Sequence, residues 1–180
     1  MEKIIDQTSH SVIIKESDMK FGEYSLDNVF LMEESDQHIK IKTHGCKTVE
    51  FVLLRKKALL FVEAKTKPRD PYSTEPDAKK KADEYISEIA QKFSDSISLY
   101  MSIIAKRQPP DGLSGKLQSL DYEKTNIQFI LVINDCNSSI LIYIHDKLTS
   151  LLCKTKTIWR VGDVLVIDKA MAVKKKLLTE

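Results

Sequence analysis

Residues 47–65 read Lys-Thr-Val-Glu-Phe-Val-Leu-Leu-Arg-Lys-Lys-Ala-Leu-Leu-Phe-Val-Glu-Ala-Lys, and this stretch decides the fold. Two runs rich in β-branched, aromatic and leucine residues flank the charged corner Arg55-Lys56-Lys57, which predicts a β-hairpin. Two adjacent lysines are poor residues for a tight primed turn, so the loop type stays open. Any loop centred on them pairs the same residues: Leu54 with Leu59, Val52 with Phe61, Glu50 with Glu63, and Thr48 with Lys65.

The two faces of this hairpin follow from the alternation of side chains along a strand. One face carries Glu50, Val52, Leu54, Leu59, Phe61, Glu63 and Lys65. The other face carries only apolar residues, which are Val49, Phe51, Leu53, Leu60, Val62 and Ala64. Both faces are mostly apolar, which favours a sheet covered by helices. The exception is one end of the first face, where two carboxylates and a lysine gather.

The residues before the hairpin predict short elements. Residues 11–15 read as a short strand. Ser25 is a suitable cap for a helix carrying Leu26, Val29 and Phe30, but residues 29–32 serve equally well as a buried strand. Periodicity alone does not separate these two alternatives.

The residues after the hairpin predict alternating helices and strands. Thr74-Glu75-Pro76-Asp77 is typical of a helix start, and apolar positions keep helical spacing from there to about Lys106. Residues 109–112 then break the chain. Further elements are expected in the order strand, helix, strand and helix: residues 127–133, residues 138–152 capped by Asn137-Ser138, residues 164–167, and a short helix capped by Asp168. This order predicts one α/β domain over residues 1–180, with a mixed β-sheet and a central hairpin flanked by helices.

Composition places the chain among globular proteins. Hydrophobic residues make up 42% and charged residues 30% of 180 residues, with a net charge of +2, which excludes disordered and collagen-like classes. No apolar run approaches the ~20 residues that span a bilayer, and the N-terminus lacks a signal-peptide stretch. The chain has three widely separated cysteines, so a disulfide framework is not expected. We expect a reduced, cytoplasmic protein without a membrane partner.

The charged end of the hairpin points to metal-assisted chemistry. Two carboxylates facing each other across a hairpin destabilise it, and a divalent cation such as Mg²⁺ (or Mn²⁺) removes the penalty. Glu50 and Glu63 are therefore candidate metal ligands. Lys65, on the same face, is suited to orient or deprotonate a water or to stabilise charge on a phosphate. Metal-assisted attack on a phosphodiester needs this combination. The alternative is that these three residues are ordinary solvent-facing charges at strand ends.

An acid on one strand, followed about a dozen residues later by Glu-x-Lys on the next, resembles the PD-(D/E)XK nuclease superfamily. That superfamily includes restriction endonucleases and archaeal Holliday-junction resolvases. The resemblance covers roughly residues 25–135 and implies a restriction-endonuclease-like core, in which a long helix follows the Glu-x-Lys strand. It implies that Glu50 is the first motif acid and that Glu63 and Lys65 belong to the second motif. Many members also carry a glutamate on the first helix, for which Glu33 is the candidate catalytic residue and Glu34 its rival. Val49-Glu50 replaces the Pro-Asp pair of the family.

Basic residues suggest contacts with a phosphate backbone, where each neutralised phosphate adds salt-dependent affinity. Lys56, Lys57, Lys67 and Arg69 are the candidates expected near the proposed site, and Lys79 and Lys80 are candidates at the start of the long helix. Lysines at a helix N-terminus oppose the helix dipole, which favours a functional role for Lys79 and Lys80. For each cluster, a solvated charged surface is the alternative.

These observations predict a magnesium-dependent endonuclease that hydrolyses phosphodiester bonds in nucleic acid, with DNA favoured and a homodimer left open. The first alternative is a nuclease-like module that no longer cuts and binds nucleic acid or a protein partner. A purely structural or oligomerising domain is the second. On the long helix, Tyr85 is expected in the core and Gln91 in solvent, although some nucleases of the superfamily place site residues in this region.

Overall fold

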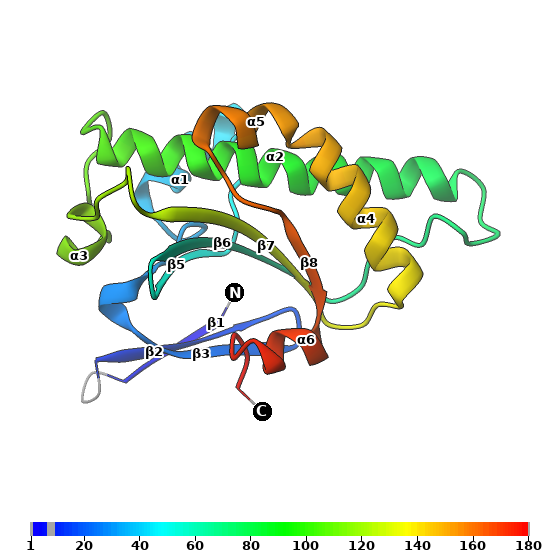
Figure 1. The fold of residues 1–180 in the computed structure, drawn as a ribbon, viewed down its shortest axis with the longest axis horizontal. Helices are drawn as coiled ribbons and strands as arrows, with labels where there is room; N and C mark the ends of the chain where they lie inside the picture. The colour runs from blue at the N-terminus through cyan, green and yellow to red at the C-terminus, as the bar shows by residue number, and fades with distance from the viewer. Residues whose placement is uncertain (1, 7–9, 180) are drawn as a thin grey trace.

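A five-stranded mixed sheet forms the centre of the computed structural model, which describes residues 2–6 and 10–179 (Figure 1). Its strand order is β4-β5-β6-β7-β8. The strands are β4 (Val29–Phe30), β5 (Phe51–Arg55), β6 (Ala58–Lys65), β7 (Asn126–Ile133) and β8 (Leu165–Asp168). Neighbours are antiparallel from β4 to β6 and parallel from β6 to β8. The predicted mixed sheet with a central hairpin is therefore confirmed.

The hairpin has the predicted register. Leu54 pairs with Leu59 and Val52 with Phe61 across β5 and β6. The ladder begins at Phe51, so Glu50 lies just before β5, and Thr48 is not part of the ladder. The alternation of side chains predicts Val49 on the same face as Phe51. This prediction is wrong, because the strand begins only at Phe51, and Val49 packs on the same side as Val52.

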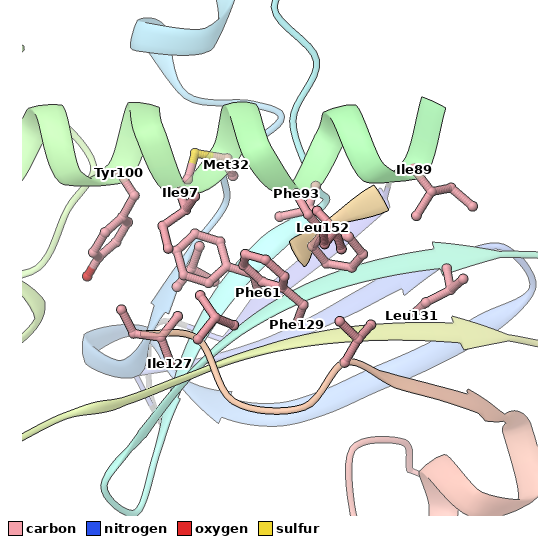
Figure 2. Close-up of a cluster of buried hydrophobic side chains, with 14 of the residues drawn as sticks. Met32, Phe61, Ile89, Phe93, Ile97, Tyr100, Ile127, Phe129, Leu131 and Leu152 are labelled. Atoms are coloured by element: carbon pink, nitrogen blue, oxygen red, sulfur yellow. The ribbon is translucent and has the colours of Figure 1, made fainter. Parts of the chain in front are cut away.

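Helices cover one face of the sheet. They are α2 (Ala78–Ile104), α4 (Ser138–Leu151) and α5 (Cys153–Trp159), and the long helix α2 lies over the sheet, roughly along the direction of β6 and β7 (Figure 1). Figure 2 shows Phe93 and Ile97 pointing from α2 toward the sheet. The rings of Phe93 and Phe129 stack with centroids 4.8 Å apart, and Phe61 meets Phe129 edge-on at 5.8 Å. This apolar contact fixes the position of α2 over β6 and β7.

A second sheet covers most of the opposite face, where helices were predicted. It is the antiparallel meander β1 (Glu2–Asp6), β2 (Ser11–Glu16) and β3 (Met19–Ser25), with α6 (Lys169–Lys174) beside it (Figure 1). Ile14 and Phe21 are buried against the face formed by Phe51, Leu53 and Val62. The prediction was wrong because an apolar sheet face indicates burial but does not specify whether a helix or a strand provides the cover.

The segment from Ser25 combines the two predicted alternatives. The Ser25 side chain caps a single 3₁₀ turn, η1 (Leu26–Asn28), and the two-residue strand β4 follows directly. Short helical elements not predicted from the sequence are α1 (Asp36–Ile41), η2 (Lys42–His44), α3 (Gly115–Gln118) and α5. The predicted caps of α4 by Asn137 and of α6 by Asp168 are confirmed. In the described part of the chain, none of the helices combines the length and the apolar character needed to span a membrane.

Candidate active site

Four of the residues selected from the sequence come together at the carboxyl end of β6. Glu63 and Lys65 lie on β6 itself, and Glu50 lies just before β5. Glu33 lies in the turn before α1, not on the first helix as the resemblance implies, yet its side chain is hydrogen-bonded to that of Glu50. Its rival Glu34 instead forms an ion pair with Lys3 at 2.6 Å.

Lys92, on α2, completes the cluster. Its Nζ lies 2.8 Å from Glu63 Oε1 and 3.5 Å from Glu50 Oε1. Lys65 Nζ also lies 2.8 Å from Glu63 Oε1. The exposed fraction of the side chain is 0% for Glu63, 5% for Glu50 and 11% for Lys92. Three acids and two ammonium groups therefore form one network, in which Glu63, Glu50 and Lys92 are almost closed to solvent while Lys65 is 29% exposed. The strand-end charges gather there as predicted.

Hydrogen bonds from the backbone set the position of Glu50. The Glu50 carbonyl oxygen accepts the N–H groups of Met32 and Glu33, at 3.1 Å and 3.4 Å. The adjacent Val49 N–H donates to Ser96 Oγ on α2 at 2.8 Å. The segment before β5 is thereby tied both to the turn that carries Glu33 and to the helix that carries Lys92.

Burial sets the protonation of the two linked acids. Burial raises the pKa of Glu50 to about 9, and the hydrogen bond with Glu33 and the charge of Glu63 act in the same direction. Burial also acts to raise the pKa of Glu33, but the hydrogen bond from Glu50 and the charge of Lys92 outweigh it, so the pKa is lowered. At neutral pH, Glu50 is therefore the protonated partner and donates to the Glu33 carboxylate.

The remaining three groups form a buried ion cluster. Burial lowers the pKa of Lys92, but the charges of Glu63 and Glu50 outweigh it, and the pKa is raised above its ordinary value. Burial raises the pKa of Glu63, against the opposing effect of Lys92 and Lys65. Oε2 of Glu63 is buried and has no hydrogen-bond partner among the described residues. This oxygen retains its capacity to bind a further ligand.

The donor set fits a magnesium ion held by few protein ligands. Glu50 and Glu63 already converge on one cation, the Lys92 ammonium. Mg²⁺ is commonly held by one or two carboxylates together with waters. Within residues 2–6 and 10–179, no group of three or more His, Cys, Asp or Glu side chains is arranged to hold a metal. Any ion at this site would therefore depend on Glu50, Glu63 and solvent.

A pocket of about 380 Å³ adjoins the cluster. Glu33, Lys65 and Lys92 line it, whereas Glu50 and Glu63 do not. The two lysines thus lie on the pocket side of the buried carboxylates. His38, also in the lining, is oriented by a contact of 2.9 Å between its Nδ1 and the Glu33 carbonyl oxygen. A phosphate in this pocket would meet Lys65 and Lys92 before Glu50 and Glu63.

The candidate phosphate-binding residues fall into two separate regions. Lys56 and Lys57 form the turn of the hairpin, at the end of β6 opposite to Glu63. At a rise of about 3.3 Å per residue they lie roughly 20 Å from Glu63, so the expectation that they are near the site is wrong. Proximity in sequence was misleading here because an extended strand separates its two ends by its full length.

Lys67 and Arg69 lie closer to the site, whereas Lys79 and Lys80 lie about 20 Å from Lys92 along α2, at a rise of about 1.5 Å per residue. Lys67 and Arg69 follow β6 at its carboxyl end, and Lys67 pairs with Asp135 at 3.6 Å. Lys79 and Lys80 line a groove of about 820 Å³ along α2. This groove shares Lys47 and Glu88 with the pocket, so the two hollows adjoin.

Lys92 was not selected from the sequence, although its spacing carries a signal. It lies three residues after Ile89 and four before Ser96, which places it on the buried face of α2. A lysine on such a face needs a carboxylate partner.

Two other residues of α2 do not join the cluster. Tyr85 packs against the core as predicted. Gln91 is exposed, and its side chain donates to the Gly45 carbonyl oxygen at 3.0 Å.

Comparison with known proteins gives no relative. No family model, no curated protein and no solved structure matches the chain. The function must therefore be inferred from the geometry and chemistry of the cluster formed by Glu33, Glu50, Glu63, Lys65 and Lys92.

Proposed function

We propose that the chain is a metal-dependent nuclease that hydrolyses phosphodiester bonds in nucleic acid, with DNA as the favoured substrate. One observation carries the proposal: Glu50 and Glu63 converge on a single cationic group, and Lys65 contacts the same oxygen of Glu63. Two acids and a lysine at the end of a strand are the groups that metal-assisted phosphodiester hydrolysis requires.

Each side chain has a distinct role in this proposal. Glu50 and Glu63 would hold Mg²⁺ or Mn²⁺, which when bound supplies a Lewis acid and lowers the pKa of a coordinated water. Glu33 orients Glu50 through their hydrogen bond. Lys65, 29% exposed and lining the pocket, stabilises negative charge on the phosphate. Hydrolysis adds the oxygen of a water to phosphorus and breaks one bond from phosphorus to a sugar oxygen.

The order of elements supports a restriction-endonuclease-like core. Three antiparallel strands, β4 to β6, precede the long helix α2, and β7 then returns parallel to β6. A mixed sheet in which a long helix follows the Glu-x-Lys strand is what the resemblance to the PD-(D/E)XK superfamily implies. A fold of this kind hosts varied functions, so the side-chain cluster carries the proposal.

Cleavage assays on end-labelled substrates test the proposal. Wild-type protein, Glu63→Gln and Lys65→Ala are incubated with duplex DNA, single-stranded DNA and RNA in Mg²⁺, in Mn²⁺ and in EDTA. We expect metal-dependent cleavage by the wild type and a loss of about a hundredfold or more in both variants. Lys57→Ala, at the far end of β6, is the matched lysine control and should cut normally. Cleavage that persists in EDTA, or normal cleavage by folded Glu63→Gln, would refute the site.

A binding module without cleavage is the second candidate, and Lys92 favours it. Its ammonium already contacts both of the acids that would hold a metal ion. Fluorescence anisotropy with labelled DNA over a range of salt concentrations tests this candidate. If Lys79 and Lys80 each neutralise one phosphate, the double substitution to Ala lowers the salt slope by about 1.8. Binding with this slope change, but no cleavage in any metal, would select the module over the nuclease.

A further inference from the structure

The ammonium of Lys92 makes the contacts that a metal ion would make at the candidate site. It touches Oε1 of Glu63 at 2.8 Å and Oε1 of Glu50 at 3.5 Å. We propose that Lys92 is an internal counter-ion, which holds the two acids together in the absence of metal and competes with the divalent cation for them. This inference rests on the proposed function, because it concerns how the same site is loaded.

The helix presents Lys92 to the site by its packing. Ile89 and Phe93, on either side of Lys92, are buried against the sheet, and Ser96 one turn later binds the backbone of Val49. The backbone of Lys92 is therefore fixed in position, while its four-carbon side chain keeps rotational freedom. An ion pair built on a fixed helix forms whenever no competing cation is present.

The pocket provides a place for the ammonium when it leaves the acids. Lys92 lines the pocket of about 380 Å³ together with Glu33 and Glu88. A change of side-chain rotamer toward this space would keep the charge hydrated and near a carboxylate. The exchange of Lys92 for a metal ion therefore needs no movement of α2.

The charges around Glu63 indicate whether Lys92 raises or lowers the affinity of the site for a metal ion. Glu63 contacts two ammonium groups, and Lys65 remains beside it when Lys92 leaves. Without the Lys92 charge, the carboxylates of Glu33 and Glu63 face a single lysine, and the site gains attraction for a divalent cation. With the charge in place, the acids are stabilised but the metal must displace it. Lys92 thus stabilises the metal-free site and lowers its affinity for a metal ion.

Calorimetric titration with Mn²⁺ tests the competition. The proteins are the wild type, Lys92→Met, which keeps most of the side-chain length without the charge, and Lys92→Arg, which keeps the charge. We expect Lys92→Met to bind Mn²⁺ about tenfold or more tightly than the wild type, and Lys92→Arg to bind no more tightly than the wild type. In EDTA, the melting temperature of Lys92→Met should fall below that of the wild type, because Glu50 and Glu63 lose their shared cation.

The outcomes separate this inference from the proposed function. If the wild type binds Mn²⁺ and Lys92→Met binds it no more tightly, the competition is refuted while the metal site stands. If neither protein binds Mn²⁺ at millimolar concentration, both proposals fall. Where Lys92→Met does not fold, wild-type protein labelled with ¹⁵N-lysine gives the answer by NMR. The Nζ signal absent from Lys92→Arg should shift on addition of Mg²⁺, and an unchanged signal in metal-bound protein would overturn the inference.

Discussion

The proton held between Glu50 and Glu33 should make the folded state less stable as pH rises. Burial raises the pKa of Glu50 to about 9, from an ordinary value of 4.5. Between these two values, the folded chain keeps a proton that the unfolded chain has lost. The stability due to this group is therefore fully present below pH 4.5 and is lost as pH rises toward 9. Each pH unit costs about 1.4 kcal/mol, so the loss from pH 6 to pH 8 is about 2.7 kcal/mol.

Urea unfolding in EDTA at pH 6, 7 and 8 measures this loss, with Glu50→Gln as the comparison. Glutamine does not ionise, and its amide N–H can still donate to the Glu33 carboxylate. The difference in unfolding free energy between wild type and variant should change by about 2.7 kcal/mol over this range. At an m-value of about 2 kcal/mol/M, the midpoints shift relative to each other by roughly 1.4 M urea.

Neither Glu33 nor Glu34 should contribute to this pH dependence of the unfolding free energy. The lowered pKa of Glu33 leaves that acid ionised in both states throughout the range, so it adds no slope. Glu34→Gln changes an acid that pairs with Lys3 outside the cluster, and this control should follow the wild type. If the free energies of wild type and Glu50→Gln change in parallel between pH 6 and pH 8, Glu50 is not protonated in the folded state and the reasoning fails.

Substitutions at three further positions test the scaffold by urea unfolding at constant pH. Phe129→Ala removes a fully buried ring that stacks on Phe93, and should cost about 3–5 kcal/mol; a cost under about 1 kcal/mol would contradict the position of α2 over the sheet. Ser96→Ala leaves the buried N–H of Val49 without its acceptor, for about 1–3 kcal/mol, and Ser96→Thr, which keeps the hydroxyl, should cost less. Asn137→Ala removes the cap of α4 and should cost about 1 kcal/mol, whereas Asn137→Asp should be nearly neutral; equal losses for both would argue against the cap.

Local patterns in the sequence were sufficient for the hairpin and the helix caps. The register of β5 and β6 follows from the charged corner at Lys56-Lys57 and from the alternation beyond it, because the side-chain period of a strand is a property of neighbouring residues. The caps by Asn137 and Asp168 are likewise predictable, since a capping side chain bonds to a backbone N–H three residues later.

The cover on the second face of the sheet was decided by tertiary structure. The apolar face of Phe51, Leu53 and Val62 requires burial, but either a helix or a sheet satisfies that requirement. In the meander, only β2 and β3 contribute buried side chains, and all five residues of β1 are exposed. A strand that buries nothing leaves no hydrophobic pattern in the sequence by which it could be predicted.

Some residues of the candidate site could likewise be grouped from the sequence, and others only from the tertiary structure. Glu63 and Lys65 lie on one strand two residues apart, so their shared face follows from the sequence by itself. Lys92 joins them only because Phe93 packs on Phe129 and sets the rotation of α2 over the sheet. Lys57 is nearer to Glu63 in sequence but lies at the opposite end of β6. Periodicity within one element is local, whereas the contact between two elements depends on how their apolar faces pack, and only the tertiary structure decides that.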